Sequence, residues 1–256
     1  MLSDPRSEKV KGIARLNQKD ARYETGLFLL EGFQGLKEVK PHTDLIEEVL
    51  ATEAAMDAHP ELFQGLEVTV VSERVMDRIC DTKTPQGVVC VVHQLDVDLD
   101  LVISNKPKLV AILDQIRDPG NAGTVLRAAD AAGADAVIFS KESVDLYNPK
   151  VVRSTTGSLF HLPIVIDAQL PAAISRLKAE GIQVLAAAAS GTLITEVQTL
   201  SDPTAWIFGN EAHGIRPEVL DLADQVVALP IFGSAESLNL ATAASVCLYQ
   251  SALSQN

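Results

Sequence analysis

The stretch Ala205-Trp206-Ile207-Phe208-Gly209-Asn210-Glu211-Ala212-His213-Gly214-Ile215 joins a short apolar run to a loop rich in glycine, amide and carboxylate groups. An apolar run of this length bounded by turn residues is typical of a buried strand. A second loop of the same kind, Pro230-Ile231-Phe232-Gly233-Ser234-Ala235-Glu236-Ser237-Leu238-Asn239-Leu240-Ala241, leads into an alanine-rich segment. Two such loops can meet one ligand at the carboxyl edge of a parallel sheet.

The sequence around these loops alternates regularly between strand and helix patterns. Short apolar segments from Leu109 onward are separated by stretches of helical periodicity, which predicts a parallel sheet covered on both faces. We expect strands at 109–113, 136–139, 163–166, 183–187, 205–208 and 225–229. We expect helices at 122–132, 149–158, 171–180, 217–223 and 237–253.

A smaller α/β module precedes this region. Its expected strands lie at 26–32, 46–52, 66–71 and 88–92, with helices at 35–39 and 72–79. Ser72 is a suitable N-cap for the second helix. A polar, proline-bearing stretch follows, so we expect domains at 1–99 and 109–256 with a linker at 100–108.

Composition narrows the class of protein. The 256 residues are 47% hydrophobic, enough for one large or two modest domains. No window is apolar enough for a membrane span, and the N-terminus lacks the apolar core of a signal peptide, so we expect a cytoplasmic protein. Cys80, Cys90 and Cys247 lack the spacing of metal ligands, which favours buried thiols and no metal site.

The charge distribution is uneven. A formal net charge of −13 argues against a polyanionic partner. Residues 1–40, however, contain eight Lys or Arg against six Asp or Glu. Lys11, Arg15, Lys19 and Arg22 recur at helical spacing, so one helix would carry them on one face. Such a face is either a nucleic-acid contact or a solvated surface.

The loop after the strand at 109–113 also carries polar chemistry. Gly120 and Gly123 allow close approach of a backbone or a ligand, Asn121 is a good N-cap, and Arg127 follows nearly two turns into the helix. A capped helix with one surface arginine is the simpler interpretation. No Gly-x-Gly-x-x-Gly or P-loop pattern is present, which argues against a nicotinamide-dependent enzyme and against phosphotransfer.

The polar residues of the two opening loops allow alternatives. Glu211 is either an acid favoured at a helix N-terminus or a ligand of a ribose or amine. His213 is more simply structural or exposed than catalytic, because no nucleophile accompanies it. Ser237 is a suitable cap for the last helix, which would leave the Asn239 amide free as donor and acceptor.

These residues, in this order, resemble the motifs of the SpoU (TrmH) family of ribose 2′-O-methyltransferases, within the SPOUT class. The first motif, Asn-x-Gly-x-x-x-Arg, stands as Asn121, Gly123 and Arg127. The second, Gly-(Asn/Ser)-Glu-x-x-Gly after a strand, stands at 209–214, and the third spans 229–241. The stretches 28–32 and 81–87 look like the family's ribosomal-protein-like substrate-binding domain, so the resemblance covers nearly the whole chain.

The resemblance implies an α/β protein with a small N-terminal substrate-binding domain and a C-terminal SPOUT parallel-sheet domain tied in a deep trefoil knot. Knots are nearly absent from proteins, and the helix expected at 237–253 would be the threaded element. Members of the family form homodimers and bind S-adenosylmethionine in the knot. The expected cofactor-binding residues are Ala187, Gly209, Asn210, Ile231, Ser237 and Leu238.

The resemblance also implies roles in catalysis and RNA binding. The family assigns activation of the ribose hydroxyl to the first-motif arginine. Because a guanidinium is effectively always charged, we expect Arg127 to hold the adjacent phosphate and stabilise the alkoxide, while a phosphate oxygen takes the proton. The residues expected to orient these groups are Asn121, Glu211, Ser237 and Asn239. The expected RNA-binding residues are Lys11, Arg15, Lys19, Arg22, Arg117 and Arg153.

The added N-terminal domain resembles the ribosomal-RNA members of the family more than the minimal transfer-RNA members. We therefore expect an S-adenosylmethionine-dependent 2′-O-methyltransferase acting on 23S ribosomal RNA. The alternatives are a tRNA 2′-O-methyltransferase and a catalytically silent RNA-binding SPOUT protein. The intact motif residues Arg127, Glu211 and Asn239 argue against the silent protein.

Overall fold

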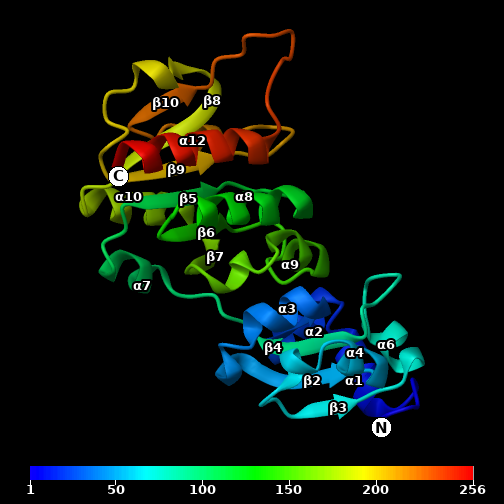
Figure 1. Cartoon of the computed structure of the whole chain (residues 1–256). Coiled ribbons are helices and arrows are strands. Elements are labelled where there is room, and N and C mark those ends of the chain that lie inside the picture. Colours follow the sequence, from blue (N-terminus) through cyan, green and yellow to red (C-terminus); the bar gives the residue numbers. More distant parts are fainter. Residues whose placement is uncertain (256) are drawn as a thin grey trace. The chain divides into compact units, whose positions relative to one another are not determined.

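The computed structural model describes residues 1–255, and their contacts divide the chain into two compact units (Figure 1). The first unit contains residues 1–95 and 145–160. The second contains residues 96–144 and 161–255. The segment 145–160 thus completes the first unit although it lies between two strands of the second.

The first unit is built on a four-stranded sheet with the order β1-β4-β2-β3. Its strands are β1 (Leu27–Glu31), β2 (Ile46–Ala51), β3 (Val68–Val70) and β4 (Val88–His93). The central strand β4 pairs antiparallel with β1 and β2, and β2 pairs parallel with β3. The four strands lie where the apolar runs predicted them.

Short helices surround this sheet. They are α1 (Glu8–Arg15), α2 (Lys19–Thr25), α3 (Gly32–Val39), the 3₁₀ turn η1 (Thr43–Leu45), α4 (Glu53–Ala58), α5 (Pro60–Phe63), α6 (Glu73–Ile79), α9 (Pro149–Thr155) and the 3₁₀ turn η2 (Ser158–Phe160). Ser72 occupies the N-cap position of α6 as predicted, but its hydroxyl makes no capping hydrogen bond.

No single helix spans residues 11–22, although the spacing of the four basic residues would fit one. Helix α1 ends at Arg15, and the Asn17 amide donates to the carbonyls of Ala14 and Ile79 at 3.2 and 2.7 Å, which holds the chain in a turn. Helix α2 then begins at Lys19. The four basic residues therefore belong to two helices, and the predicted common face does not form.

The inserted segment is held in the first unit by buried polar contacts. The guanidinium of Arg22 donates to the Asp145 carboxylate through Nε, at 3.0 Å, and through a second nitrogen, while its third nitrogen donates to the Leu16 carbonyl. Tyr147 packs on Phe28 with ring centroids 4.9 Å apart. These contacts explain why residues that follow a strand of the second unit fold with the first.

The second unit contains a six-stranded sheet with the order β10-β8-β9-β5-β6-β7, and every neighbouring pair is parallel (Figure 1). The strands are β5 (Leu109–Leu113), β6 (Ala136–Ser140), β7 (Ile164–Ala168), β8 (Gln183–Leu193), β9 (Thr204–Phe208) and β10 (Gln225–Ala228). Its helices are α7 (Leu99–Ser104), α8 (Pro119–Ala131), α10 (Leu170–Ala179), the 3₁₀ turn η3 (Ile194–Glu196), α11 (Pro217–Leu220) and α12 (Leu240–Gln255). The predicted parallel α/β sheet is confirmed. Residues 100–104 of the stretch expected to be the linker belong to helix α7.

Alternate residues of each strand face opposite layers of helices. Val110 and Ile112 pack with Ile174 of α10 and Val219 of α11 in one buried cluster. On the other face, the Trp206 indole N–H donates to the hydroxyl of Ser251 in α12 at 2.9 Å, and both groups are buried. A strand that is covered on both faces consists of consecutive apolar residues, which is why these strands were predicted well.

The last helix starts later than predicted. Helix α12 begins at Leu240, whereas Ser237 and its neighbours form an exposed, irregular segment. From the edge strand β10, α12 returns to the middle of the sheet, where it contacts α8, β9 and β5 (Figure 1). The threading of this helix into a trefoil knot stays a prediction. No helix within residues 1–255 has the length and apolar character needed to span a membrane.

Candidate active site

Three loops of the second unit meet outside the carboxyl ends of β5 and β9. These strands are neighbours and run parallel, so the loops that leave them emerge at the same edge of the sheet. The side-chain amide nitrogen of Asn239 donates to the side-chain oxygen of Asn121 at 3.0 Å, and the side-chain nitrogen of Asn121 donates to the Glu211 carboxylate at 3.0 Å. Residues from all three predicted motifs are thereby joined in one chain of hydrogen bonds.

Asn121 is not the cap of its helix. Asp118 caps α8, and its carboxylate accepts from the Asn121 backbone N–H at 2.7 Å. Asn121 lies in the first turn, which leaves its side-chain amide for Glu211 and Asn239. The capping prediction was wrong because two Asx residues stand close together, and the earlier one, followed by Pro119 at the first helical position, is the better start signal.

Asn239 has the capping role that was predicted for Ser237. The Asn239 side-chain oxygen accepts from the backbone N–H groups of Ala241 and Thr242 at 2.9 and 3.4 Å, so it caps α12. Its nitrogen still donates to Asn121. An amide performs both tasks because it is donor and acceptor at once, whereas the Ser237 hydroxyl makes no hydrogen bond to another described residue.

The second-motif loop is shaped by its own backbone. A Cβ at Gly209 would lie 2.2 Å from the Gly214 carbonyl carbon, so only glycine fits. The Asn210 side chain accepts from Ala212 and His213 N–H groups and donates to the Gln115 carbonyl at 2.7 Å. Asn210, predicted to bind cofactor, thus uses its side chain to fold the loop.

An ion pair between a buried aspartate and a half-buried arginine, which was not predicted from the sequence, fixes this loop to β5. Asp114 is fully buried and accepts from the Arg216 backbone N–H and Nε, each at 2.9 Å. The hydrogen bond to Asp114 raises the pKa of Arg216 above its ordinary value. The available signal was an aspartate directly after a buried strand, since a buried carboxylate requires a partner.

Two of the five predicted catalytic residues lie outside the hydrogen-bonded chain. Arg127 is exposed on α8, six residues and about 9 Å along the helix axis from Asn121. Within residues 1–255, no carboxylate forms an ion pair with its guanidinium. Ser237 is exposed in the segment before α12. The structure therefore joins Asn121, Glu211 and Asn239 and leaves Arg127 available to an outside partner.

Comparisons with known proteins match both units. Residues 108–249 match the SpoU rRNA Methylase family, and residues 7–90 match the MRM3-like substrate binding domain. The chain belongs to the SpoU rRNA methylase family. It is 33% identical over 248 residues to the 23S rRNA (guanosine(2553)-2′-O)-methyltransferase RlmP of Bacillus subtilis, covering 97% of each chain.

Solved methyltransferase structures match nearly the whole chain. The AdoMet-bound rRNA methyltransferase of Sinorhizobium meliloti has a TM-score of 0.84 and 32% identity, covering 98% of this chain and 96% of that one. The SpoU methyltransferase AviRb of Streptomyces viridochromogenes, in complex with AdoMet, has a TM-score of 0.84 and 28% identity, covering 96% and 98%. The family resemblance and the SPOUT fold drawn from the motifs are confirmed.

The SpoU loop between β10 and α12 fits S-adenosylmethionine. Ile231 and Leu238 are each 38% exposed and Phe232 is 95% exposed, so the loop holds apolar side chains in solvent. Over residues 231–238, no backbone N–H donates to another described residue. Apolar surface beside unpaired backbone donors suits an adenine ring and a thioether. The other predicted positions, Ala187 in β8 and Gly209 after β9, lie on adjacent strands.

The predicted RNA-binding residues are not equally accessible. Arg22 is 2% exposed and paired with Asp145, so its assignment to RNA binding is wrong. Lys11 and Arg15 are exposed and pair with Glu8 and Glu24, and Lys19 lies over the Tyr23 ring. Arg117 is exposed.

Arg153 occupies a different setting from the one expected. It lies in α9 of the first unit, one-third exposed, and donates to Asp81 at 2.8 Å. We expected its guanidinium to bind RNA. Its fixed pairing with a carboxylate shows that the guanidinium is already held by the protein.

Proposed function

We propose that this protein transfers a methyl group from S-adenosylmethionine to a ribose 2′-hydroxyl of 23S ribosomal RNA. The observation that carries the proposal is the hydrogen-bonded chain Asn239–Asn121–Glu211, which links one residue of each motif at the carboxyl edge of the sheet. Membership of the SpoU family supports it, as do relatives named as 23S rRNA 2′-O-methyltransferases that match over nearly their full length.

Arg127 is the residue best suited to the reacting oxygen. It is exposed, and no described carboxylate neutralises it, so its charge is available to the phosphate beside the target ribose and to the developing alkoxide. A cation aimed at charge that develops in the transition state lowers the barrier. Because the guanidinium keeps its protons, a phosphate oxygen takes the proton from the 2′-hydroxyl.

The hydrogen-bonded chain positions the reactants. The Glu211 carboxylate fixes the Asn121 amide, and Asn121 fixes the residue that starts α12. Ser237 would contact the ribose or the cofactor from the exposed segment before that helix. S-adenosylmethionine supplies an electrophilic methyl group for in-line attack, and correct placement of the attacking oxygen provides much of the acceleration.

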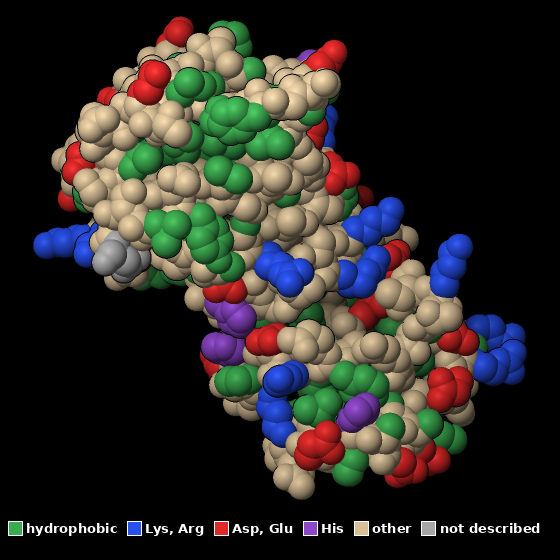
Figure 2. All heavy atoms as spheres, turned by 45° about the horizontal axis from the view of Figure 1, so that its top comes forward, with side chains coloured by type: hydrophobic (Ala, Val, Ile, Leu, Met, Phe, Trp, Pro, Cys, Tyr) green, Lys and Arg blue, Asp and Glu red, His purple; other side chains and the backbone are tan. Residues whose placement is uncertain are grey.

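The net charge of −13 requires a local account of RNA binding. Figure 2 shows Lys and Arg interspersed with Asp and Glu over the visible face. We assign the RNA contact to the exposed basic residues of both units, Lys11, Arg15, Lys19, Arg117 and Arg127. Contacts of this kind release counterions, so RNA affinity should fall steeply with added salt, and a flat response would remove these residues from the interface.

The outer face of α12 supports a homodimer. Val246, Tyr249 and Leu253 are 38, 43 and 73% exposed and recur at helical spacing, while Ala244 and Leu248 on the opposite face are buried. Hydrophobic side chains also gather on the visible surface of the second unit (Figure 2). A helix that is apolar all round is normally covered on every side. We propose that a second copy of this chain covers the exposed stripe. We also propose that the protein acts in the cytoplasm.

The proposal is tested by mapping 2′-O-methylated nucleotides in total RNA from cells with and without the gene. We expect one 23S rRNA position to lose its methyl group when the gene is deleted and to regain it on complementation. Titration calorimetry with S-adenosylmethionine provides the second readout. A methyl group lost from tRNA instead would change the substrate, and absence of cofactor binding would leave only an RNA-binding role.

A further inference from the structure

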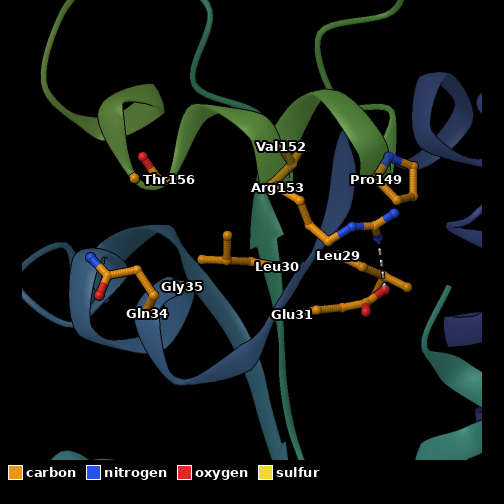
Figure 3. Close-up of a pocket in the computed structure, with 10 residues that line it drawn as sticks. Leu29, Leu30, Glu31, Gln34, Gly35, Pro149, Val152, Arg153 and Thr156 are labelled. Carbon is orange, nitrogen blue, oxygen red and sulfur yellow. Dashed lines mark ion pairs between the residues drawn. The ribbon is translucent and has the colours of Figure 1, made fainter. Parts of the chain in front are cut away.

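A cavity of about 110 Å³ lies inside the first unit, between α9 and the β1–α3 segment (Figure 3). Helix α9 covers it from one side, and β1 and α3 form the other. None of the residues around it belongs to the methyl-transfer site, and one of them, Arg153, was predicted to bind RNA. The lining residues are Leu29, Leu30, Glu31, Gln34, Gly35, Pro149, Val152, Arg153, Thr156 and Gly157.

Buried apolar side chains form the cavity walls. Leu29, Leu30 and Val152 are at most 5% exposed and hold the two sides. A Cβ at Gly35 would lie 2.6 Å from the Leu30 side chain, and one at Gly157, just after α9, would lie 2.4 Å from Glu38. Glycine at these positions therefore lets α3 pack closely on β1 and lets the chain after α9 pack closely on α3.

One end of the cavity holds a fixed carboxylate and guanidinium. The Glu31 carboxylate accepts from the Asp81 and Thr82 backbone N–H groups at 2.7 and 3.3 Å and from the Thr82 hydroxyl at 2.7 Å. The Arg153 guanidinium donates through one nitrogen to Asp81 at 2.8 Å. These contacts fix both side chains before any ligand arrives.

The second terminal nitrogen of Arg153, Nη1, makes no hydrogen bond. It is buried and forms an ion pair with Glu31 Oε1 at 3.8 Å, beyond hydrogen-bond distance (Figure 3), and it donates to no other described residue. Buried donors in proteins are normally paired. At the opposite end of the cavity lie Gln34 and Thr156, both exposed and neutral (Figure 3). The cavity therefore offers a charged donor at one end and neutral polar groups at the entrance.

We propose that this cavity binds one unpaired pyrimidine base of the RNA substrate, with a base carbonyl accepting from Arg153 Nη1. The inference rests on the proposed function for the identity of the RNA. The Glu31 carboxylate beside the guanidinium disfavours a phosphate, whereas apolar walls favour a neutral ring. The volume of about 110 Å³ is smaller than the roughly 150 Å³ of a cavity that binds benzene, so it leaves no room for the two fused rings of a purine.

Recognition of this kind is how proteins read RNA sequence. Unpaired bases are splayed out of the helix and held between side chains, while duplex RNA shows its base edges poorly. A base bound in the first unit would fix the register of the RNA independently of the methyl-transfer site. The cavity would then contribute to choice of nucleotide without touching the reacting atoms.

Methyl NMR of the full-length protein tests binding directly. With Leu and Val methyl groups labelled, we titrate cytidine, uridine, adenosine and inorganic phosphate. We expect cytidine or uridine to shift the Leu29, Leu30 and Val152 signals with an affinity on the order of millimolar, more strongly than adenosine does. Equal shifts with phosphate alone, stronger shifts with adenosine, or none with any nucleoside would overturn the proposal.

A substitution that fills the cavity tests the role in RNA binding. Val152→Phe fills the cavity, whereas Val75→Ala disturbs buried packing of the same unit at a residue that does not line it. We expect the Phe variant to raise KM for 23S rRNA about tenfold, because it excludes one base, with kcat and S-adenosylmethionine affinity unchanged. The Val75→Ala variant should keep the wild-type KM.

Folding and function are separated by further readouts. Arg153→Met removes the donor without filling the cavity and should abolish the nucleoside-induced shifts. This variant keeps the proposal testable if Val152→Phe fails to fold. A folded Val152→Phe protein with wild-type KM would refute the role in RNA binding. If the wild-type protein methylates no rRNA, the proposed function fails, but the nucleoside titration still decides whether the cavity binds a base.

Discussion

The two units use arginine in opposite ways. Arg127 in the second unit is exposed, and no described carboxylate pairs with it, whereas Arg22 in the first is 2% exposed and bonded to Asp145. Both belong to helices, and both were predicted to meet RNA. The difference shows that a basic residue of a helix is either exposed to an outside partner or held as a structural anchor, according to which side of its helix faces the core.

The largest effect is expected at Arg127. Arg127→Ala should lower kcat by about 10³-fold, because it removes the charge opposite the developing alkoxide. Methylation assays measure this loss, and calorimetry should show unchanged S-adenosylmethionine affinity. Arg176→Ala, which removes another exposed arginine of the same unit, is the matched control and should keep full turnover. Near-normal turnover of Arg127→Ala would remove this residue from the mechanism.

Arg22 should affect stability instead of chemistry. Arg22→Met leaves the Asp145 carboxylate, 8% exposed, buried without its partner, and removal of one member of a buried pair costs about 3–5 kcal/mol. Arg15→Met breaks a pair whose side chains are 61 and 68% exposed and should cost at most about 1 kcal/mol. Urea unfolding measures both. Similar losses of unfolding free energy in Arg22→Met and Arg15→Met would contradict the structural role of the buried arginine.

The sequence predicted the second unit better than the details of its polar residues. Strands such as Leu109–Leu113 are covered on both faces, so their apolar runs mark them without reference to distant residues. The joining of Asn121, Glu211 and Asn239 followed from motif order and parallel topology. These predictions rested on local patterns and on one rule of sheet geometry.

What the sequence could not provide depended on contacts between distant residues. The Arg22–Asp145 pair spans 123 positions, and nothing near either residue indicates it. The Asp114–Arg216 pair spans 102 positions. Segment 145–160 joins the first unit through such contacts, which a pattern read along the chain cannot reveal. The caps of α8 and α12 were misassigned for a local reason, because neighbouring polar residues compete for the same role.

Asn239 allows the structural and positioning roles to be separated within one residue. Asn239→Asp keeps the oxygen that caps α12 but loses the donor to Asn121. We expect the unfolding free energy to stay within about 1 kcal/mol of wild type and kcat to fall about tenfold, since a misplaced reactant slows an oriented reaction. Asn239→Ala, which loses both contacts, should lower both quantities. A fully active Asp variant would limit Asn239 to helix capping.

The smallest effect is expected from the three thiols. They lie in both units and line neither the candidate active site nor the cavity, so they allow burial in the two units to be compared. Burial raises the pKa values of Cys80, Cys90 and Cys247 to about 12. Only the thiolate reacts, so iodoacetamide at pH 8 should label none of them in the native protein and should label all three after unfolding. A raised folded pKa contributes stability that is fully present below the unfolded value near 9 and is lost as pH rises toward 12.

The half-buried Cys80 separates the effect of burial from that of charge. Its pKa is raised first by burial and then by Glu31 and Asp77, whereas Cys90 and Cys247 are buried and their pKa values are raised by burial alone. Because Cys80 is half-buried and Cys247 is buried, mass spectrometry after timed alkylation at rising pH should find Cys80 labelled before Cys247. Simultaneous labelling would show that the two units open together, and rapid labelling of Cys80 at pH 8 would show that its side of α6 is accessible in the native protein.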